Sequence, residues 1–173
     1  KSSELNRNQD YRIQLEGPLL KNKLTFFTNF RFQDNKNYLN GIHRFNPGDY
    51  SDYTRSDSSS WYSEKTGDGE YVPLAFDKQI SFLGKLTYKV SGDLRFSLNY
   101  ILNDFESAGY RTSVNGNPGA RYSHAYKYNP YGMANTFNKT HLLNFLTNHT
   151  ISRNIFHEMK LSYTQNDNSS YVF

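Results

Sequence analysis

The feature that most constrains this chain is an alternation of apolar and polar residues that recurs in separate segments. In the clearest segment, Leu94, Phe96 and Leu98 alternate with Arg95 and Ser97. Because successive side chains of a β-strand point to opposite faces, each such segment is predicted to be a strand with one apolar and one mostly polar face. The predicted strands lie near residues 10–16, 24–34, 76–90, 94–104, 141–151 and 155–165. No segment keeps a helical period over the length of a helix, so the predicted fold class is all-β.

The connections between these strands alternate between very short and very long. The short ones lie around residues 17–22, 91–93 and 152–154, where Gly, Pro, Asn and Ser favour tight turns. The long ones span residues 35–75 and 105–139, although loops beyond about 12–15 residues are uncommon in compact domains. Outer-membrane barrels combine short periplasmic turns with long extracellular loops. The alternation therefore predicts three antiparallel hairpins of a transmembrane β-barrel, with the turns in the periplasm and both long loops outside the cell.

The composition agrees with β-structure and solvent-exposed loops. It argues against a disordered chain, a transmembrane helix, a disulfide-bonded protein and a nucleic-acid-binding protein. The chain is 36% hydrophobic but 17% aromatic, and this aromatic content argues against disorder. It has no apolar run of about 18 residues for a transmembrane helix, whereas a barrel strand needs only about 9–11 residues, half of them polar. Without cysteine there are no disulfides or thiolate metal sites. The net charge of +4 is scattered, which argues against nucleic-acid binding.

The number of strands indicates that a barrel would extend beyond this chain. Six strands leave two open edges, which lipid does not tolerate, and bacterial barrels begin at about eight strands. We therefore expect either a fragment of a larger barrel or strands that pair with other copies of the chain. Tyr88, Tyr100 and Tyr163 lie near strand ends on the apolar face, where tyrosines form the aromatic girdles of membrane proteins.

Three stretches resemble parts of one protein family. Residues 16–27 hold a Gly-Pro turn followed by Lys-Leu-Thr-Phe-Phe, residues 124–132 read His-Ala-Tyr-Lys-Tyr-Asn-Pro-Tyr-Gly, and residues 147–163 form a predicted hairpin. In this order and spacing they resemble the barrel of TonB-dependent outer-membrane receptors of the Bacteroidetes type.

The resemblance implies a barrel of about 22 strands that encloses an N-terminal plug domain. Such receptors import scarce nutrients across the bacterial outer membrane with energy from the TonB complex. The implied partners are outer-membrane lipid, the remainder of the barrel, the plug, and the TonB complex through parts outside this chain. A surface lipoprotein is a further candidate partner. The plug and the segment that contacts TonB are expected to lie outside these residues.

No motif predicts catalysis, a metal or a cofactor. The histidines lack metal-binding spacing and are interpreted as isolated interface or loop residues: His43, His124, His141, His149 and His157. Acidic residues of the first long loop could supply oxygen ligands to calcium, but they lack the full EF-hand pattern, and a solvated loop is predicted. They are Asp49, Asp52, Asp57, Glu64, Asp68 and Glu70. We therefore expect no enzyme activity and no cofactor.

Aromatic residues crowd both long loops and are the candidate substrate-binding residues. Such rings suit stacking on sugars or contact with peptides, and they equally suit packing of one loop on another. The candidates are Trp61, Tyr62, Tyr110, Tyr122, Tyr126, Tyr128 and Tyr131.

The leading functional hypothesis is part of a transport receptor that takes up an iron chelate, a vitamin, a glycan or a peptide. One alternative is a soluble or surface-attached β-sandwich that binds glycan through the same loops. Another is a passive porin-type barrel from a different family. An upstream plug would favour the receptor, whereas stability without detergent would favour the sandwich.

Overall fold

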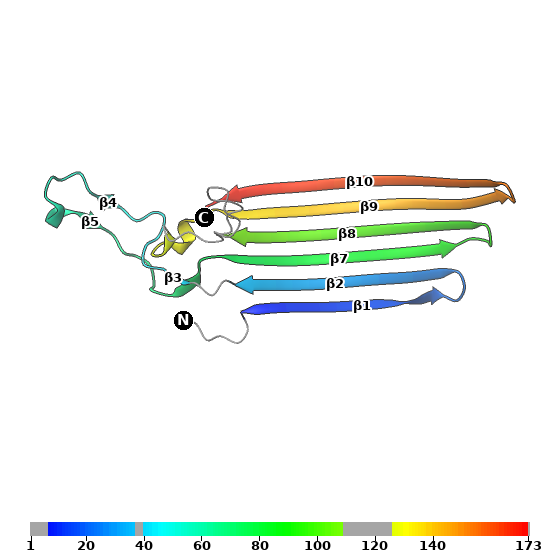
Figure 1. Cartoon of the computed structure of the whole chain (residues 1–173), viewed down its shortest axis with the longest axis horizontal. Helices are drawn as coiled ribbons and strands as arrows, with labels where there is room; N and C mark the ends of the chain where they lie inside the picture. Colours follow the sequence, from blue (N-terminus) through cyan, green and yellow to red (C-terminus); the bar gives the residue numbers. More distant parts are fainter. Residues whose placement is uncertain (1–6, 37–39, 109–125, 173) are drawn as a thin grey trace.

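Six long strands form one antiparallel sheet (Figure 1). The computed structural model describes residues 7–36, 40–108 and 126–172. The strand order is β1-β2-β7-β8-β9-β10, so each strand lies beside its neighbour in the sequence among the long strands. Their bounds are β1 (Asn8–Leu20), β2 (Leu24–Lys36), β7 (Phe76–Lys89), β8 (Leu94–Ala108), β9 (Asn135–Ser152) and β10 (Ile155–Tyr171). The predicted all-β class and the three hairpins are confirmed.

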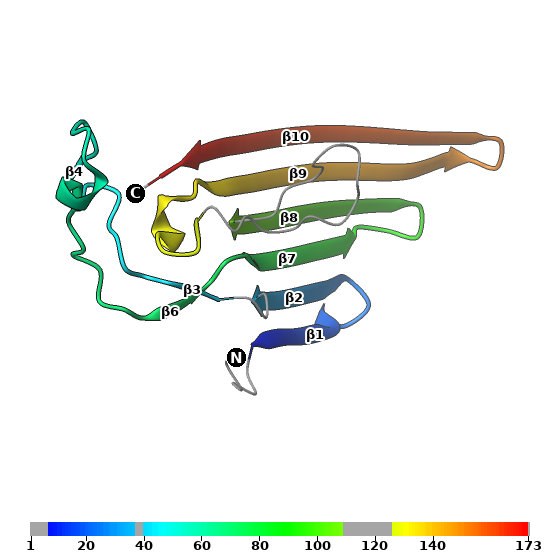
Figure 2. The same cartoon turned by 60° about the vertical axis from the view of Figure 1, so that its left-hand side comes forward.

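The tight turns all lie at one end of the sheet and the long connections at the other (Figures 1 and 2). In the first turn Asn22 adopts a left-handed conformation with a φ of 61°, which asparagine tolerates better than most residues. In the second, the hydroxyl of Ser91 accepts hydrogen bonds from the backbone N–H groups of Asp93 and Leu94. Asn22 and Ser91 thus stabilise their turns in different ways, the first by its backbone conformation and the second by its side-chain hydrogen bonds.

The strands are longer than the alternation predicts. β9 begins at Asn135 rather than near 141, and β10 runs to Tyr171 rather than 165. These added ends are rich in Asn, Ser and Thr, residues usual in loops, but they pair with each other over their full length. β1 also continues through Pro18, which an edge strand tolerates because one side of its ladder is unpaired.

The long connections are correspondingly shorter, and the first is not structureless. It runs from 37 to 75 rather than 35 to 75, and the second from 109 to 134 rather than 105 to 139. The first contains β3 (Asn40–Ile42) paired with β6 (Tyr71–Pro73), and β4 (Ser51–Asp52) paired with β5 (Tyr62–Ser63). A 3-10 helix, η1 (Ser58–Ser60), lies between β4 and β5, and a second, η3 (Pro130–Gly132), precedes β9.

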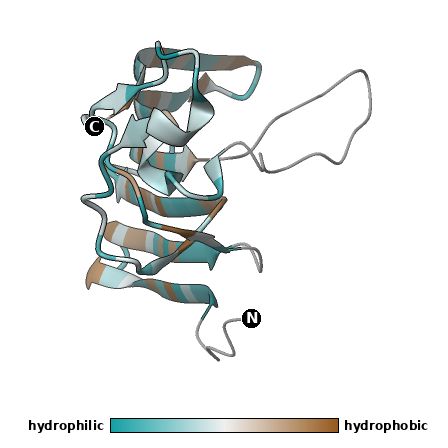
Figure 3. Ribbon diagram, turned by 90° about the vertical axis from the view of Figure 1, so that its left-hand side faces the viewer, coloured by the Kyte–Doolittle hydropathy of each residue, from teal (hydrophilic) through white to brown (hydrophobic). Residues whose placement is uncertain are grey.

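One face of the sheet is apolar, and its side chains remain exposed. Paired residues of neighbouring strands share a face, and one such row runs from Phe26 through Leu86 and Leu98 to Phe145 and Leu161. Even on central strands, Leu86 and Leu98 are 42% and 41% exposed. Figure 3 shows the alternation of apolar and polar residues along the strands. The sheet therefore has no hydrophobic core on this face.

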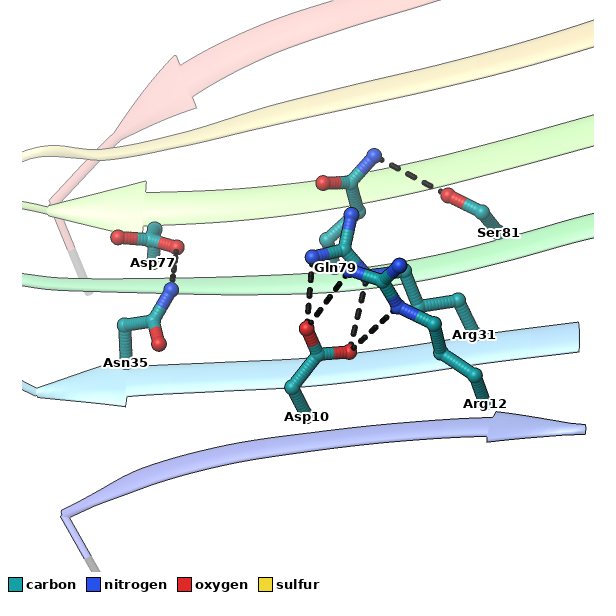
Figure 4. Close-up of polar contacts among 7 residues, drawn as sticks. All are labelled: Asp10, Arg12, Arg31, Asn35, Asp77, Gln79 and Ser81. Carbon is teal, nitrogen blue, oxygen red and sulfur yellow. Dashed lines mark hydrogen bonds and ion pairs between the residues drawn. The ribbon is translucent and has the colours of Figure 1, made fainter.

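The opposite face is mostly polar and carries bonds between side chains of different strands. Arg31 of β2 makes a two-pronged contact with Asp10 of β1, with N–O distances of 2.9 and 2.8 Å, and Arg12 approaches the same carboxylate (Figure 4). Asn35 similarly donates to Asp77 of β7. Such contacts suit a surface that faces water.

The buried apolar residues of the described chain gather at the loop end of the sheet. Leu74 and Ala75 precede β7, Ala108 ends β8, and Met133 precedes β9; each is at most 7% exposed. The small core thus lies where the two long connections leave the sheet. In the described part of the chain, no helix has the length and apolarity needed to cross a membrane.

Candidate functional site

The two long connections meet in a region that we call the loop junction, formed by residues 40–46, 66–75 and 126–134. Backbone bonds join its parts. The N–H of Ile42 donates to the carbonyl of Lys127 at 2.7 Å, and the N–H groups of Arg44 and Phe45 both donate to the carbonyl of Tyr128 at 3.1 Å. The junction therefore links segments more than 80 residues apart in the sequence.

Two glycines permit close approaches within the loop junction. A β-carbon on Gly41 would lie 2.9 Å from the carbonyl oxygen of Lys127 and from a methyl group of Leu74. One on Gly67 would lie 2.3 Å from the carbonyl oxygen of His43. Both distances are too short for any larger residue without movement of the backbone. Gly41 therefore lets the second connection approach the first, and Gly67 lets two parts of the first connection approach each other.

His43 lies at the centre of the loop junction with bonds to both ring nitrogens. Its Nδ1 is 2.8 Å from a carboxylate oxygen of Asp68, and its Nε2 is 2.9 Å from the amide oxygen of Asn46. The ring of Tyr131, from the other connection, packs edge-on at 4.7 Å between ring centres. Burial alone would lower the pKa of His43, but its bonds to Asn46 and Asp68 and the charges of Asp68 and Glu70 raise it overall.

The acidic residues of the first connection hold its turns together. Asp49 accepts bonds from the side chain of Thr66 and from the backbone N–H groups of Thr66 and Asn46. Asp57 caps η1 by accepting from the backbone and hydroxyl of Ser59. Hydrogen bonds of this kind lower the pKa values of Asp49, Asp52, Asp57 and Asp68. Within the described ranges, no cluster of three or more histidine, aspartate or glutamate side chains could hold a metal ion.

Three of the candidate aromatic residues meet in the loop junction. Tyr126 is half-buried, whereas Tyr128 and Tyr131 are exposed. The guanidinium of Arg44 and the ammonium of Lys127 lie 5.4 and 5.2 Å from the centre of the Tyr128 ring. An exposed ring flanked by two cations can stack on a flat ligand and attract an anionic group on it.

Two further candidates lie in a separate cluster at the far tip of the first connection, which projects beyond the sheet (Figures 1 and 2). Trp61 packs edge-on against Tyr53, with 5.5 Å between ring centres, and its ring N–H donates to the carbonyl of Arg55. Tyr62, the next residue, is exposed in β5. The structure therefore divides the described candidates between the tip and the loop junction. Tyr110 and Tyr122 lie outside the described residues.

A hollow of about 900 Å³ also opens on the mostly polar face of the sheet. Phe27, Leu83 and Ile101 form its apolar part, and Lys85 and Asn99 are among its polar residues. These three apolar residues come from three different strands, so no local pattern in the sequence predicts that they meet.

No protein-family model, no curated protein and no solved structure matches the chain.

Proposed function

We propose that this chain is part of the wall of an outer-membrane β-barrel, and that the barrel belongs to a TonB-dependent receptor that takes up a nutrient. The observation that carries the proposal is the exposed apolar face. Leaving one large apolar side chain in water rather than burying it costs about 2 kcal/mol, and this face exposes such side chains on every long strand. Lipid would cover them without any second protein layer.

The slant of the apolar face supports a barrel wall. The row that holds Phe32 and Ile80 continues into Asp104, Lys139 and Asp167. Closer to the loops than Asp167, this face of β10 carries one further aromatic side chain, Tyr171, and the continuous run of apolar residues begins at Tyr163, four residues closer to the turns than Asp167. This shift of about 13 Å across five strand spacings of about 4.8 Å corresponds to a slant of about 30°. Barrel strands tilt by about 35–45°, which slants a level membrane band across them in the same way.

The strand lengths and the charged rows also support the proposal. The long strands have 13 to 18 residues, whereas strands of soluble proteins usually have 3–10. Toward the loop end, the apolar face gives way to charged side chains, among them the ion pair of Lys139 with Asp104 at 3.1 Å. A barrel strand longer than the bilayer core would extend in this way into the aqueous layer.

The receptor, rather than a passive porin, is proposed because of the resemblance in three stretches and because of the ordered loop junction. Aromatic residues of the loops would contact the substrate outside the cell. The hollow at Phe27, Leu83 and Ile101 would face the lumen, where another part of the same protein would cover its apolar residues.

The test is extraction of the full-length protein from membranes. We expect it to require detergent, to insert into lipid vesicles and to migrate differently in gels when unheated. A protein that stays monomeric and folded without detergent would instead favour a β-sandwich. Among barrels, uptake of a nutrient that stops when the TonB complex is absent would support the receptor, and uptake that continues would favour the porin.

A further inference from the structure

The hydrogen-bond network around His43 determines the protonation state of its ring. Thr66 gives its hydroxyl hydrogen to the carboxylate of Asp49, so its oxygen is free to accept a bond from the side-chain amide nitrogen of Asn46 at 2.8 Å. This bond orients the Asn46 side chain with its oxygen toward Nε2 of His43. An amide oxygen only accepts hydrogen bonds, so Nε2 must donate.

The other ring nitrogen faces a second acceptor. The Asp68 oxygen that contacts Nδ1 also accepts a bond from the backbone N–H of Glu70 at 2.9 Å. Hydrogen bonds and the neighbouring charge of His43 lower the pKa of Asp68, so this carboxylate is ionised near neutral pH. Nδ1 must donate as well, and only an imidazolium donates from both nitrogens.

If the His43 ring were neutral, one of its two nitrogens would face a hydrogen-bond acceptor without a proton to donate. The charged groups near His43 on its own connection are carboxylates: Asp49, Asp68 and Glu70. Across the loop junction lies Tyr131, while Lys127 and Arg44 lie against the Tyr128 ring instead. A neutral imidazole would point a lone pair at Asp68 or Asn46, and the His43 side chain is only 11% exposed, so water has little access to relieve this contact.

We propose that His43 is a proton-dependent latch, which as an imidazolium keeps the first long connection closed on residues 126–134 and which releases them when it loses its proton. His43 is placed to do this because its neighbours in the sequence make the cross-junction bonds: Ile42 to Lys127, and Arg44 and Phe45 to Tyr128. The latch would thereby control how Tyr128 and Tyr131 are presented to a ligand. This proposal rests on the geometry of the loop junction, and it applies whether or not the sheet lies in a membrane.

The pH range follows from the direction of the pKa changes. The pKa of His43 is raised above its ordinary 6.5, so its contribution is fully present below about pH 6.5 and is lost as the pH rises through the raised value. The pKa of Asp68 is lowered from 3.8, so its contribution is present above that pH and is lost in stronger acid. The latch is therefore closed between these limits.

The test is hydrogen exchange of the full-length protein, measured by mass spectrometry at several pH values and corrected for the chemical exchange rate. For peptides that cover residues 41–45, we expect protection to fall by about tenfold for each unit by which the His43 pKa is raised. Peptides from β7 and β8 serve as the internal reference. Protection of the loop junction that stays constant between about pH 6 and pH 9 would overturn the proposal.

The pH dependence of hydrogen exchange in three variants distinguishes a proton-dependent latch from a histidine that has only a structural role. Asp68→Asn should move the midpoint of the transition to lower pH, and His43→Phe, which keeps a ring against Tyr131, should abolish the pH dependence. His149→Gln, at the turn end of β9, is the matched control and should leave the profile unchanged. A midpoint unaffected by Asp68→Asn would contradict the proposal. If that variant fails to fold, titration of the His43 ring by nuclear magnetic resonance decides, because a pKa at or below 6.5 would equally contradict it.

Discussion

The sheet and the loop junction are ordered by different forces. The sheet is held by backbone ladders between strands of 13 to 18 residues, and its apolar side chains remain exposed. The loop junction has little regular structure, yet it contains the buried residues Leu74 and Met133 and the doubly bonded His43. No part of the described chain covers the apolar face of the sheet, whereas the loop junction has its own core and polar network.

The largest expected effect comes from placing a charge on the exposed apolar face. Leu98→Lys should destabilise the full-length protein in lipid vesicles by about 2–4 kcal/mol, because a charge near the middle of the bilayer is poorly solvated. The control is Asn103→Lys on the opposite face, expected to cost about 0.5 kcal/mol or less. Asn103 is preferred to Ser97, which is only 5% exposed, and to Asn99, which lines the hollow. Denaturant unfolding measures both. Equal costs would remove the distinction between the two faces.

The next effect concerns the core of the loop junction. Leu74 is 2% exposed, so Leu74→Ala should destabilise the junction by about 2–3 kcal/mol through lost contacts and a residual cavity. The same substitution at Leu86, on the exposed face, should leave the junction unchanged. Hydrogen exchange at residues 41–45 measures the opening free energy. If both variants weakened these amides alike, the loop junction and the sheet would form one cooperative unit.

Acid should separate the two regions further. The pKa values of Asp49 and Asp68 are lowered by their hydrogen bonds, so the stability they contribute is present above about pH 4 and is lost as the pH falls below it. Exchange should therefore accelerate in residues 40–46 and 66–72 in acid, while the β7–β8 ladder keeps its protection. Asp49→Asn should reduce this acid response. An unchanged response in that variant would point to other carboxylates.

The smallest effect is expected at the projecting tip. Asp57→Ala removes the cap of η1, where the carboxylate accepts bonds from the backbone and hydroxyl of Ser59. Because this residue is exposed, exchange should accelerate only in peptides around residues 57–61. Faster exchange that spread to His43 would show that the tip and the loop junction are coupled.

The positions of the six long strands, the tight turns and the two faces of the sheet are predictable from the sequence. This information is local: alternation fixes which side chains share a face, Asn22 tolerates the left-handed backbone of its turn, and Ser91 supplies hydrogen bonds to its own turn. The candidate aromatics Trp61 and Tyr128 were also visible as loop residues. The sequence did not reveal the full length of β9 and β10, because their Asn- and Ser-rich ends have loop composition and become strands by pairing with each other.

The loop junction, by contrast, depends on contacts between residues far apart in the sequence. His43 was interpreted from the sequence as an isolated residue, but its partner Asp68 is 25 positions away, and the carbonyl that accepts from Ile42 belongs to Lys127. No local pattern encodes these contacts. They form because the antiparallel sheet brings the ends of β2, β7, β8 and β9 to one edge. There Gly41 lets the two connections approach closely, and Gly67 lets two parts of the first connection do so.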